Sequence, residues 1–224
     1  MNAPQKDIDR LQREIDQARS HAAKARKGRT TEVRKQRNAS KRVFVLVLPI
    51  ALIGIAWVIE TVDQLFFAGS LNFPVRPGGP LWGIFTAPFS HADFGHLIAN
   101  TLYFIPLSYL VLLNGLSHYL AVWGCVVSLN LFQLFFWPRG GHGMSGVVYG
   151  LVGYLLVIGI AERRPLSLAL TVFAFVTYAH FVPTLLPWIS PPGISWIGHF
   201  MGFTGGVFAA LGMFREDHKQ ERAK

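Results

Sequence analysis

Charged side chains are scarce over most of this chain. They make up 15% of its 224 residues, whereas a soluble domain carries about a quarter. Residues 43–214 contain only four basic side chains, which are Arg76, Arg139, Arg163 and Arg164. A composition this poor in charge argues against an ordinary soluble domain and indicates a body that lies in a membrane.

Cysteine is almost absent as well, with Cys125 the single example. One cysteine excludes a disulfide framework within the chain, and its place in an apolar run favours a packing role. The HExxH motif of metal enzymes is also lacking, and His91 and His96 stand five positions apart. We therefore expect neither a metal ion nor another cofactor.

Positive charge is concentrated near the N-terminus. Residues 1–42 hold 13 of the 21 lysines and arginines but only 5 of the 12 aspartates and glutamates. The net charge of +9 fits nucleic-acid binding in principle. However, basic residues directly before a long apolar run are typical of the cytoplasmic side of a membrane span. The expected partner is thus the lipid bilayer and not a nucleic acid.

Apolar residues recur in this basic arm at alternating spacings of three and four. They are Ile8, Leu11, Ile15, Ala18 and Ala22. The pattern predicts a short amphipathic helix. A helix that is exposed to water or lies among lipid headgroups is the favoured interpretation, and a coiled coil that binds a partner protein is the alternative.

Six apolar segments approach the roughly 20 residues that a helix needs to cross a bilayer. They are 43–60, 94–113, 119–137, 145–161, 166–182 and 194–214. We therefore predict an all-α membrane protein with a six-helix bundle in residues 43–214, a basic arm in 1–42 and a tail in 215–224. Six spans put the arm, Arg163-Arg164 and the basic tail on one side, so both termini are predicted to be cytoplasmic.

The connection after the first predicted span is long and rich in large apolar residues. It covers residues 61–93, in which aromatic and aliphatic side chains alternate with proline and glycine. A loop exposed to water would not carry so many apolar groups, and aromatic rings settle at the membrane interface. We expect a structured element that lies partly in that interface.

A glycine-rich turn precedes the fourth predicted span and places Ser145 near a helix N-terminus. Unpaired backbone N–H groups at such an end favour negative charge, so a serine there has an oxyanion-stabilising field beside it. Gly146 and Gly150 form a small-xxx-small face that permits another helix to approach closely. Tyr149 shares a side of the helix with Ser145.

The sixth predicted span carries His199 in line with Gly202 and Gly206. If this stripe packs against Gly146 and Gly150, the two backbones can approach closely and the imidazole is delivered toward the serine. The spacing therefore predicts a Ser–His pair, the arrangement of an activated nucleophile and its base.

His96 and Asn100 share a face at the start of the second predicted span. Two neutral donors there could complete an oxyanion hole with the backbone N–H of Ser145. The nearby acids, such as Asp93 and Glu162, fall at the ends of predicted spans, so a catalytic dyad is favoured over a triad.

These three elements together resemble the rhomboid family of intramembrane serine proteases. The chain has HxxxN at His96–Asn100, GxSGxxxG at Gly143–Gly150 and HxxGxxxG at His199–Gly206, in family order and in the second, fourth and sixth spans. The resemblance covers residues 43–214. One departure is Gly83, which follows Trp82 where many members have arginine, so the loop anchoring that the arginine would give is not expected.

The resemblance implies a function and a location. Ser145 would attack the scissile peptide carbonyl of a transmembrane protein substrate, with His199 as general base and then general acid. His96, Asn100 and the Ser145 amide would hold the oxyanion, and Tyr149 would pack against the His199 ring. His91 aligns with a histidine that anchors the first loop, and the fifth span with residues 183–192 would form a substrate gate. The expected location is a bacterial plasma membrane.

Each polar residue also has a purely structural interpretation. A lone serine in a membrane helix usually bonds a local carbonyl, and lone histidines and asparagines usually link helices. Structural roles are favoured for four further side chains, which are Asn130, Gln133, His142 and His180. Two other functions compete with proteolysis. A catalytically silent rhomboid-like protein would bind client helices, and a transporter or channel would use the polar groups to line a pore.

Overall fold

The computed structural model describes residues 32, 35–36, 39–136, 140–190 and 194–222. The amphipathic helix predicted for residues 8–22 lies outside them. The chain divides into two compact units, residues 1–46 and 47–224, and the second contains the helical bundle. Over the described residues the secondary structure is helical, apart from one isolated antiparallel bridge between Val75 and Gly141.

Five helices among the described residues are long and apolar enough to cross a membrane. They are Ala39–Phe67, Phe94–Leu112 (α3), Leu116–Phe135, Ser145–Glu162 (α6) and Trp196–Lys219. The third of these contains α4 (Leu116–Asn130) and most of α5 (Gln133–Phe136), and the last lies within α8 (Trp196–Arg222). The helical class predicted from the sequence is confirmed, whereas length alone does not establish the predicted count of six spans.

The sixth apolar helix is shorter than a typical membrane span. The structure has α7 at Pro165–Tyr178, continued by a 3₁₀ turn, η3, at Ala179–Phe181. Pro165 occupies the first helical position, where the missing N–H leaves no intrahelical bond unmade. A second 3₁₀ turn, η4, follows at Pro183–Leu185, so regular α-helix ends before the predicted boundary at residue 182.

The first span extends beyond its predicted end at residue 60. Its last turn is a π-helical segment, η1, at Asp63–Phe67, and the chain then turns through Ala68 and Gly69, which both have positive φ. The Asp63 carboxylate accepts a hydrogen bond from the backbone N–H of Leu71 at 2.7 Å. A polar side chain that bonds the following turn therefore ends this helix, and hydropathy does not mark that position.

The connection between the first span and α3 is structured, as its composition indicated. It contains a short helix, α2, at Gly83–Thr86 and a 3₁₀ turn, η2, at Ala87–Phe89. Reciprocal backbone hydrogen bonds of 2.9 and 3.0 Å join Val75 to Gly141. The connection is thereby attached to the turn that precedes α6.

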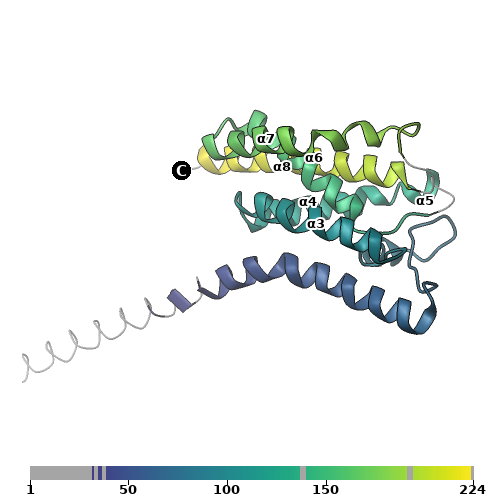
Figure 1. Cartoon of the computed structure of the whole chain (residues 1–224). Coiled ribbons are helices and arrows are strands. Elements are labelled where there is room, and N and C mark those ends of the chain that lie inside the picture. The colour runs from purple at the N-terminus through teal and green to yellow at the C-terminus, as the bar shows by residue number, and fades with distance from the viewer. Residues whose placement is uncertain (1–31, 33–34, 37–38, 137–139, 191–193, 223–224) are drawn as a thin grey trace, which may run out of the picture. The chain divides into compact units, whose positions relative to one another are not determined.

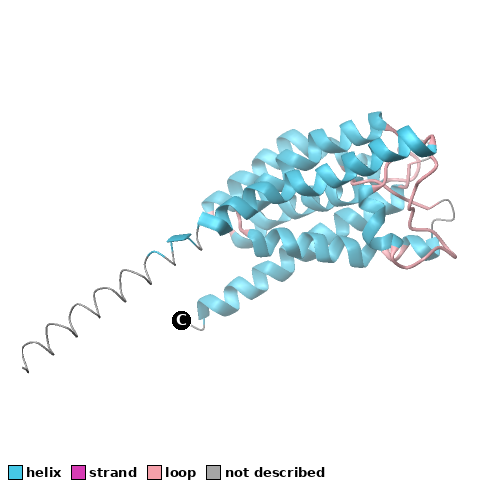
Figure 2. Ribbon diagram, turned by 90° about the horizontal axis from the view of Figure 1, so that it is seen from below, coloured by secondary structure: helices cyan, strands magenta, loops and turns pink. Residues whose placement is uncertain are grey.

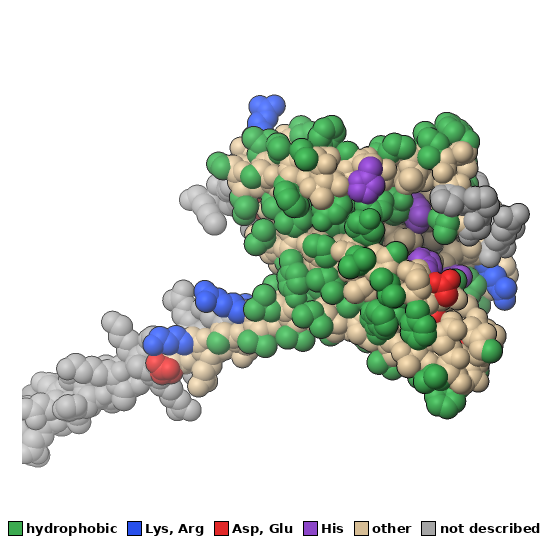
Figure 3. Space-filling model, in the orientation of Figure 1, with side chains coloured by type: hydrophobic (Ala, Val, Ile, Leu, Met, Phe, Trp, Pro, Cys, Tyr) green, Lys and Arg blue, Asp and Glu red, His purple; other side chains and the backbone are tan. Residues whose placement is uncertain are grey.

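Helix α6 is the centre of the bundle. It contacts α3, α4, α7 and α8, and Figure 1 shows it among those helices. Its most apolar stretch is 61% buried, compared with 22–39% for the other four candidate spans. A helix that is hydrophobic all round belongs in an interior. The outer helices expose many large apolar side chains, and Figure 3 shows hydrophobic side chains spread over the visible face.

The connections that carry the glycine-rich turn gather at one end of the bundle. Figure 2 shows most of the loop segments at that end. The residues that end α6 and begin α7 lie at the other end, near the last turns of α8, because the Arg164 guanidinium lies 3.7 Å from the Asp217 carboxylate. The start of α6 is therefore the end that bears the predicted site.

Helices α6 and α8 approach so closely at their glycines that no side chain fits between the two backbones there. A Cβ added at Gly202 would overlap the carbonyl oxygen of Gly146, and one added at Gly206 would overlap that of Gly150. Without a hydrophobic driving force between helices in lipid, close backbone packing of this kind is a main source of association.

This contact predicts a difference between two glycines of the same helix. Gly206→Ala should lower the thermal unfolding temperature of the protein in detergent micelles, because overpacking typically destabilises by about 1–3 kcal/mol. Gly212→Ala is the matched control, since no described atom of another helix lies within 4 Å of its Cβ position and alanine is the better helix former. Equal unfolding temperatures for the two variants would contradict the close approach of α6 and α8.

Candidate functional site

Ser145 is the first residue of α6, where the preceding turn is held by hydrogen bonds from the connection before α3. Gly143 has φ of +105° and donates its N–H to the Ala87 carbonyl at 2.8 Å. The next amide, that of Met144, donates to Nε2 of His91 at 3.3 Å. Farther along, the amides of Val147 and Val148 donate to the Met144 carbonyl, whereas the first N–H groups of a helix have no acceptor in a preceding helical turn.

His199 lies in the first turn of α8 and meets Ser145 directly. Its Nε2 is 3.0 Å from the serine Oγ, within the range of a nucleophile–base hydrogen bond. The imidazole stacks on the ring of Tyr149, with centroids 4.1 Å apart and planes 17° from parallel. Stacking on Tyr149, one turn beyond Ser145, fixes the orientation of the imidazole.

The second nitrogen of this imidazole has no acidic partner. Nδ1 of His199 is buried and makes no hydrogen bond within the described residues. The arrangement is therefore a Ser–His pair without the carboxylate that orients the histidine of a Ser–His–Asp triad. Stacking on Tyr149 takes the place of that orienting bond.

His96 and Asn100 lie beside the turn that leads into α6. A Cβ built on Gly143 would stand 3.0 Å from Nε2 of His96 and 3.5 Å from Nδ2 of Asn100. Glycine at that position therefore lets both side chains approach the region in front of Ser145. Nδ2 of Asn100 is buried and has no hydrogen-bond partner in the described part of the chain, which leaves a donor available for a ligand.

These side chains border one cavity of about 370 Å³. Ser145, His199, His96 and Asn100 line it from three helices. Because water is excluded from the hydrocarbon of a bilayer, polar groups in membrane helices are tolerated where they face such a cavity. The cavity thus brings together a hydroxyl, an imidazole and neutral donors, which are the groups that acyl transfer requires.

Comparison with known proteins assigns the chain to a family. The model of the Rhomboid domain matches residues 78–216, more than half of the chain. This protein belongs to the rhomboid family. Together with the five apolar helices, the match makes it an integral membrane protein.

Relatives of this rhomboid occur in mycobacteria. Uncharacterized proteins of Mycobacterium bovis and Mycobacterium tuberculosis are each 29% identical to it in an alignment of 191 residues that covers 78% of either chain. An uncharacterized protein of Mycobacterium leprae is 29% identical in an alignment of 186 residues that covers 78% of this chain and 74% of its own. The names of these relatives state no activity, so the similarity assigns neither a reaction nor a substrate to this rhomboid.

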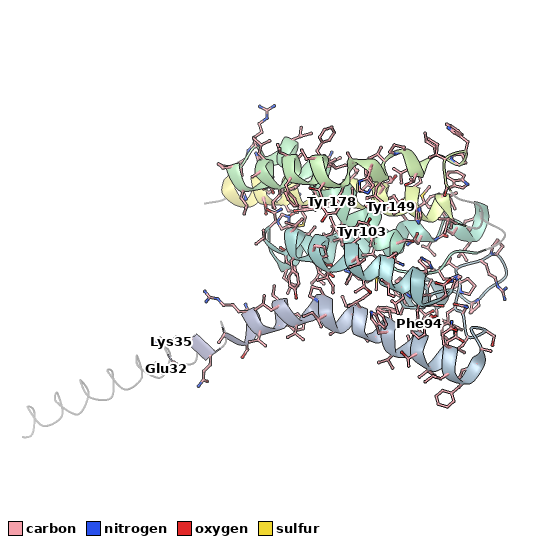
Figure 4. The ribbon with its side chains drawn as sticks, viewed as in Figure 1. Glu32, Lys35, Phe94, Tyr103, Tyr149 and Tyr178 are labelled. Carbon is pink, nitrogen blue, oxygen red and sulfur yellow. The ribbon has the colours of Figure 1, made fainter. Side chains whose placement is uncertain are left out.

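The sequence did not identify the individual residues that form one wall of the rhomboid cavity. Phe181 and Thr184 line it, and the Tyr149 hydroxyl lies 2.5 Å from Oγ1 of Thr184. Phe181 packs edge-on against Tyr149 and Tyr103, with centroids 5.2 and 4.9 Å away. Figure 4 shows Tyr103, Tyr149 and Tyr178 close together on neighbouring helices. A phenylalanine in an apolar segment carries no pattern that marks it as a cavity wall.

The opposite wall contains the amides for which the sequence favours interhelical links. Gln133 donates from Nε2 to Oδ1 of Asn130 at 3.0 Å and accepts from Oγ of Ser195 at 2.8 Å. This chain of bonds links α4, α5 and the start of α8. Of the remaining histidines, His180 is exposed and His142 is half-buried at the cavity.

His91 is buried and anchors the turn that precedes Ser145. Burial, followed by the neighbouring His96 and His142, lowers the pKa of His91 to about 3. The ring is therefore neutral at physiological pH and Nε2 has a free lone pair for the Met144 N–H. Protonation would remove that acceptor and place a charge in a buried position.

This shift predicts an acid-sensitive fold. At pH values between 6.5, the ordinary pKa of histidine, and about 3, the lowered pKa of His91, this side chain is protonated in the unfolded chain and neutral in the folded chain. The free energy of unfolding therefore falls as pH drops through that window, by up to about 1.4 kcal/mol per pH unit. Unfolding temperatures recorded from about pH 7 to pH 4 should decline less steeply in His91→Asn, while His180→Asn should follow the wild type. A wild-type slope in His91→Asn would contradict the assignment.

Proposed function

We propose that this rhomboid is an intramembrane serine endopeptidase that cleaves a peptide bond in or near a transmembrane segment of another protein. The observation that carries the proposal is the 3.0 Å contact between Ser145 Oγ and His199 Nε2 in a cavity that also holds unpaired donors. A serine that only stabilised its helix would bond a local carbonyl and would need no imidazole at that distance.

The proposed reaction has two halves. Ser145 Oγ attacks the scissile carbonyl carbon and gives its proton to His199 Nε2. The carbonyl oxygen becomes an oxyanion that accepts hydrogen bonds from Asn100, His96 and the Ser145 backbone N–H. As the C–N bond breaks, His199 donates that proton to the departing amine and an acyl-enzyme remains.

Water completes the cycle. His199, again neutral, takes a proton from a water molecule whose oxygen attacks the acyl carbon. Collapse of the second oxyanion breaks the bond to Ser145 Oγ, which recovers its proton from His199. The products are an amine terminus and a carboxyl terminus. The cavity supplies the space that water needs at this depth, since bulk lipid provides none.

The same proposal includes six spans, with α7 as the fifth, and a protease body in residues 43–214. Both termini are then cytoplasmic and the cavity lies near the opposite face, which fits the positive charges of the arm and the tail. Helix α7 packs mainly on α6, and η3 and η4 border the cavity. A short helix with few neighbours is suited to a gate for a substrate helix, whose carbonyls become accessible only where small residues let it unwind.

The rival function is a silent rhomboid that binds client helices without cutting them. Such a protein needs neither the serine nor the histidine, yet both are present and in contact. Reactivity of the serine separates the two functions.

Labelling with a fluorophosphonate tests the proposal. The wild type in detergent micelles should be labelled, whereas Ser145→Ala should not, and His199→Ala should be labelled far more slowly because the base is gone. Cleavage of a reconstituted model transmembrane substrate should follow the same order. Ser128→Ala is the control and should behave as the wild type, because that hydroxyl bonds the Gly124 carbonyl of its own helix. A folded wild type that resists labelling, or equal labelling of Ser145→Ala, would refute the proposal in favour of client binding.

The oxyanion role of Asn100 has its own test. Asn100→Ala should lower kcat by roughly 10²–10³ with little change in KM, because the donated bond strengthens only as charge develops on the carbonyl oxygen. A mere link between helices would instead appear as a lower unfolding temperature with kcat preserved. The measurement is a cleavage time course beside a thermal melt of the same preparation.

A further inference from the structure

A second cluster of ionisable side chains lies at the other end of the bundle from Ser145. It consists of His118 in the first turn of α4, Glu162 at the end of α6 and Asp217 in the last turns of α8. One nitrogen or oxygen of each lies within 4.8 Å of the others. Because Ser145 and Glu162 are the two ends of α6, the cluster is about 25 Å from the serine.

Helical geometry explains why these residues meet. His199 and Asp217 are about five turns apart on α8 and therefore lie on the same side of that helix. Ser145 and Glu162 are about 4.7 turns apart on α6, so their directions differ by about 100°, and Glu162 at the end of α6 still lies within reach of Asp217. The contact between α6 and α8 that brings serine to histidine at one end brings the two carboxylates together at the other.

Two of the inward-facing groups have an outer partner that orients them. Nδ1 of His118 lies 2.6 Å from the hydroxyl of Tyr154, and this leaves Nε2, which is 3.6 Å from Oδ2 of Asp217, directed into the cluster. Oε2 of Glu162 accepts a hydrogen bond from Ser167 at 2.5 Å. Histidines and carboxylates that bind metal ions are held in this way by hydrogen bonds on their far side.

Positive charge reaches the cluster from its exposed side. The Arg164 guanidinium lies 3.7 Å from Oδ2 of Asp217 and is half exposed. Further in, His118 is 5% exposed, and Oε1 of Glu162 is buried without a hydrogen-bond partner among the described residues. An unsatisfied carboxylate oxygen beside a second carboxylate is unfavourable, and a divalent cation between them would remove that penalty.

We propose that His118, Glu162 and Asp217 bind a divalent metal ion, with zinc the best match to one imidazole and two carboxylates. Tetrahedral zinc with bonds of about 2.0–2.2 Å sets its ligand atoms about 3.3–3.6 Å apart, and the His118–Asp217 separation of 3.6 Å already fits. The Glu162 carboxylate needs to move inward by about 1 Å, and water would fill the fourth position. The ion would join α4, α6 and α8, and this role is independent of proteolysis.

Metal content of the full-length protein in detergent micelles provides the test. After chelation and removal of the chelator, the wild type should take up one zinc ion per chain from a zinc-buffered solution, and its unfolding temperature should rise with free zinc. Asp217→Asn and Glu162→Gln should each weaken uptake at least tenfold and lose the thermal shift. Tyr154→Phe should weaken uptake by about 10–100-fold, since an orienting partner is lost.

Three further variants separate metal binding here from a plain ion-pair cluster and from a metal bound near Ser145. Glu216→Gln alters an exposed neighbouring acid that pairs with Lys219 and should bind zinc as the wild type does. Arg164→Gln should retain uptake, whereas a plain ion-pair cluster would show lower stability and no zinc effect in any variant. Loss of uptake in His142→Ala with normal uptake in Asp217→Asn would place the ion near Ser145. Either that result or absence of stoichiometric zinc in the folded wild type would overturn the proposal.

Discussion

The contact between the backbones of α6 and α8 determines where every other part of the site can lie. Gly202 meets the Gly146 carbonyl and Gly206 meets that of Gly150 where no Cβ fits. At this separation an imidazole in the first turn of α8 is within hydrogen-bond distance of Ser145. A pair of helices spaced by side chains, about 8–10 Å apart, would put more distance between them. At these glycines the peptide groups of the two helices touch directly, without side chains between them. Close backbone packing of this kind favours the association of helices in lipid.

Some polar groups of the cavity have no hydrogen-bond partner. Nδ1 of His199 and Nδ2 of Asn100 are buried without partners in the described part of the chain, and a buried unpaired donor is unfavourable by about 1–3 kcal/mol. Rigid neighbours hold the side chains in place: Tyr149 stacks on His199, and His91 holds the turn before Ser145. Unsatisfied groups inside a well-packed frame are what a site requires if its bonds are to form on a substrate and not within the protein.

Spacing within single helices could be interpreted from the sequence, because helical geometry fixes which residues share a face. The glycine stripes and the Ser145–His199 juxtaposition were predicted in this way, and the limits of α3 and α6 differ from the prediction by one residue at most. Contacts between elements distant in sequence were not accessible. Phe181 reaches the cavity at the end of the 3₁₀ turn that continues α7. The first span extends to Phe67, and the Asp63 carboxylate accepts a hydrogen bond from the Leu71 N–H in the turn that follows. His118, Glu162 and Asp217 share no local motif, so the expectation that no metal is bound rested on short patterns that such a cluster does not contain.

The two ends of the α6–α8 contact impose opposite electrostatic problems. At one end the close approach sets a hydroxyl against an imidazole, a neutral pair that gains a hydrogen bond. At the other, the same register sets Glu162 near Asp217, whose like charges repel most strongly where water is scarce. Shifting α8 by one turn would separate the carboxylates but would also move His199 by about 5.4 Å and force Gly202 away from Gly146. The register of α6 and α8 that places His199 beside Ser145 therefore requires a positive charge near Glu162 and Asp217. Arg164 supplies such a charge from its half-exposed position, and a bound cation would supply one between the carboxylates.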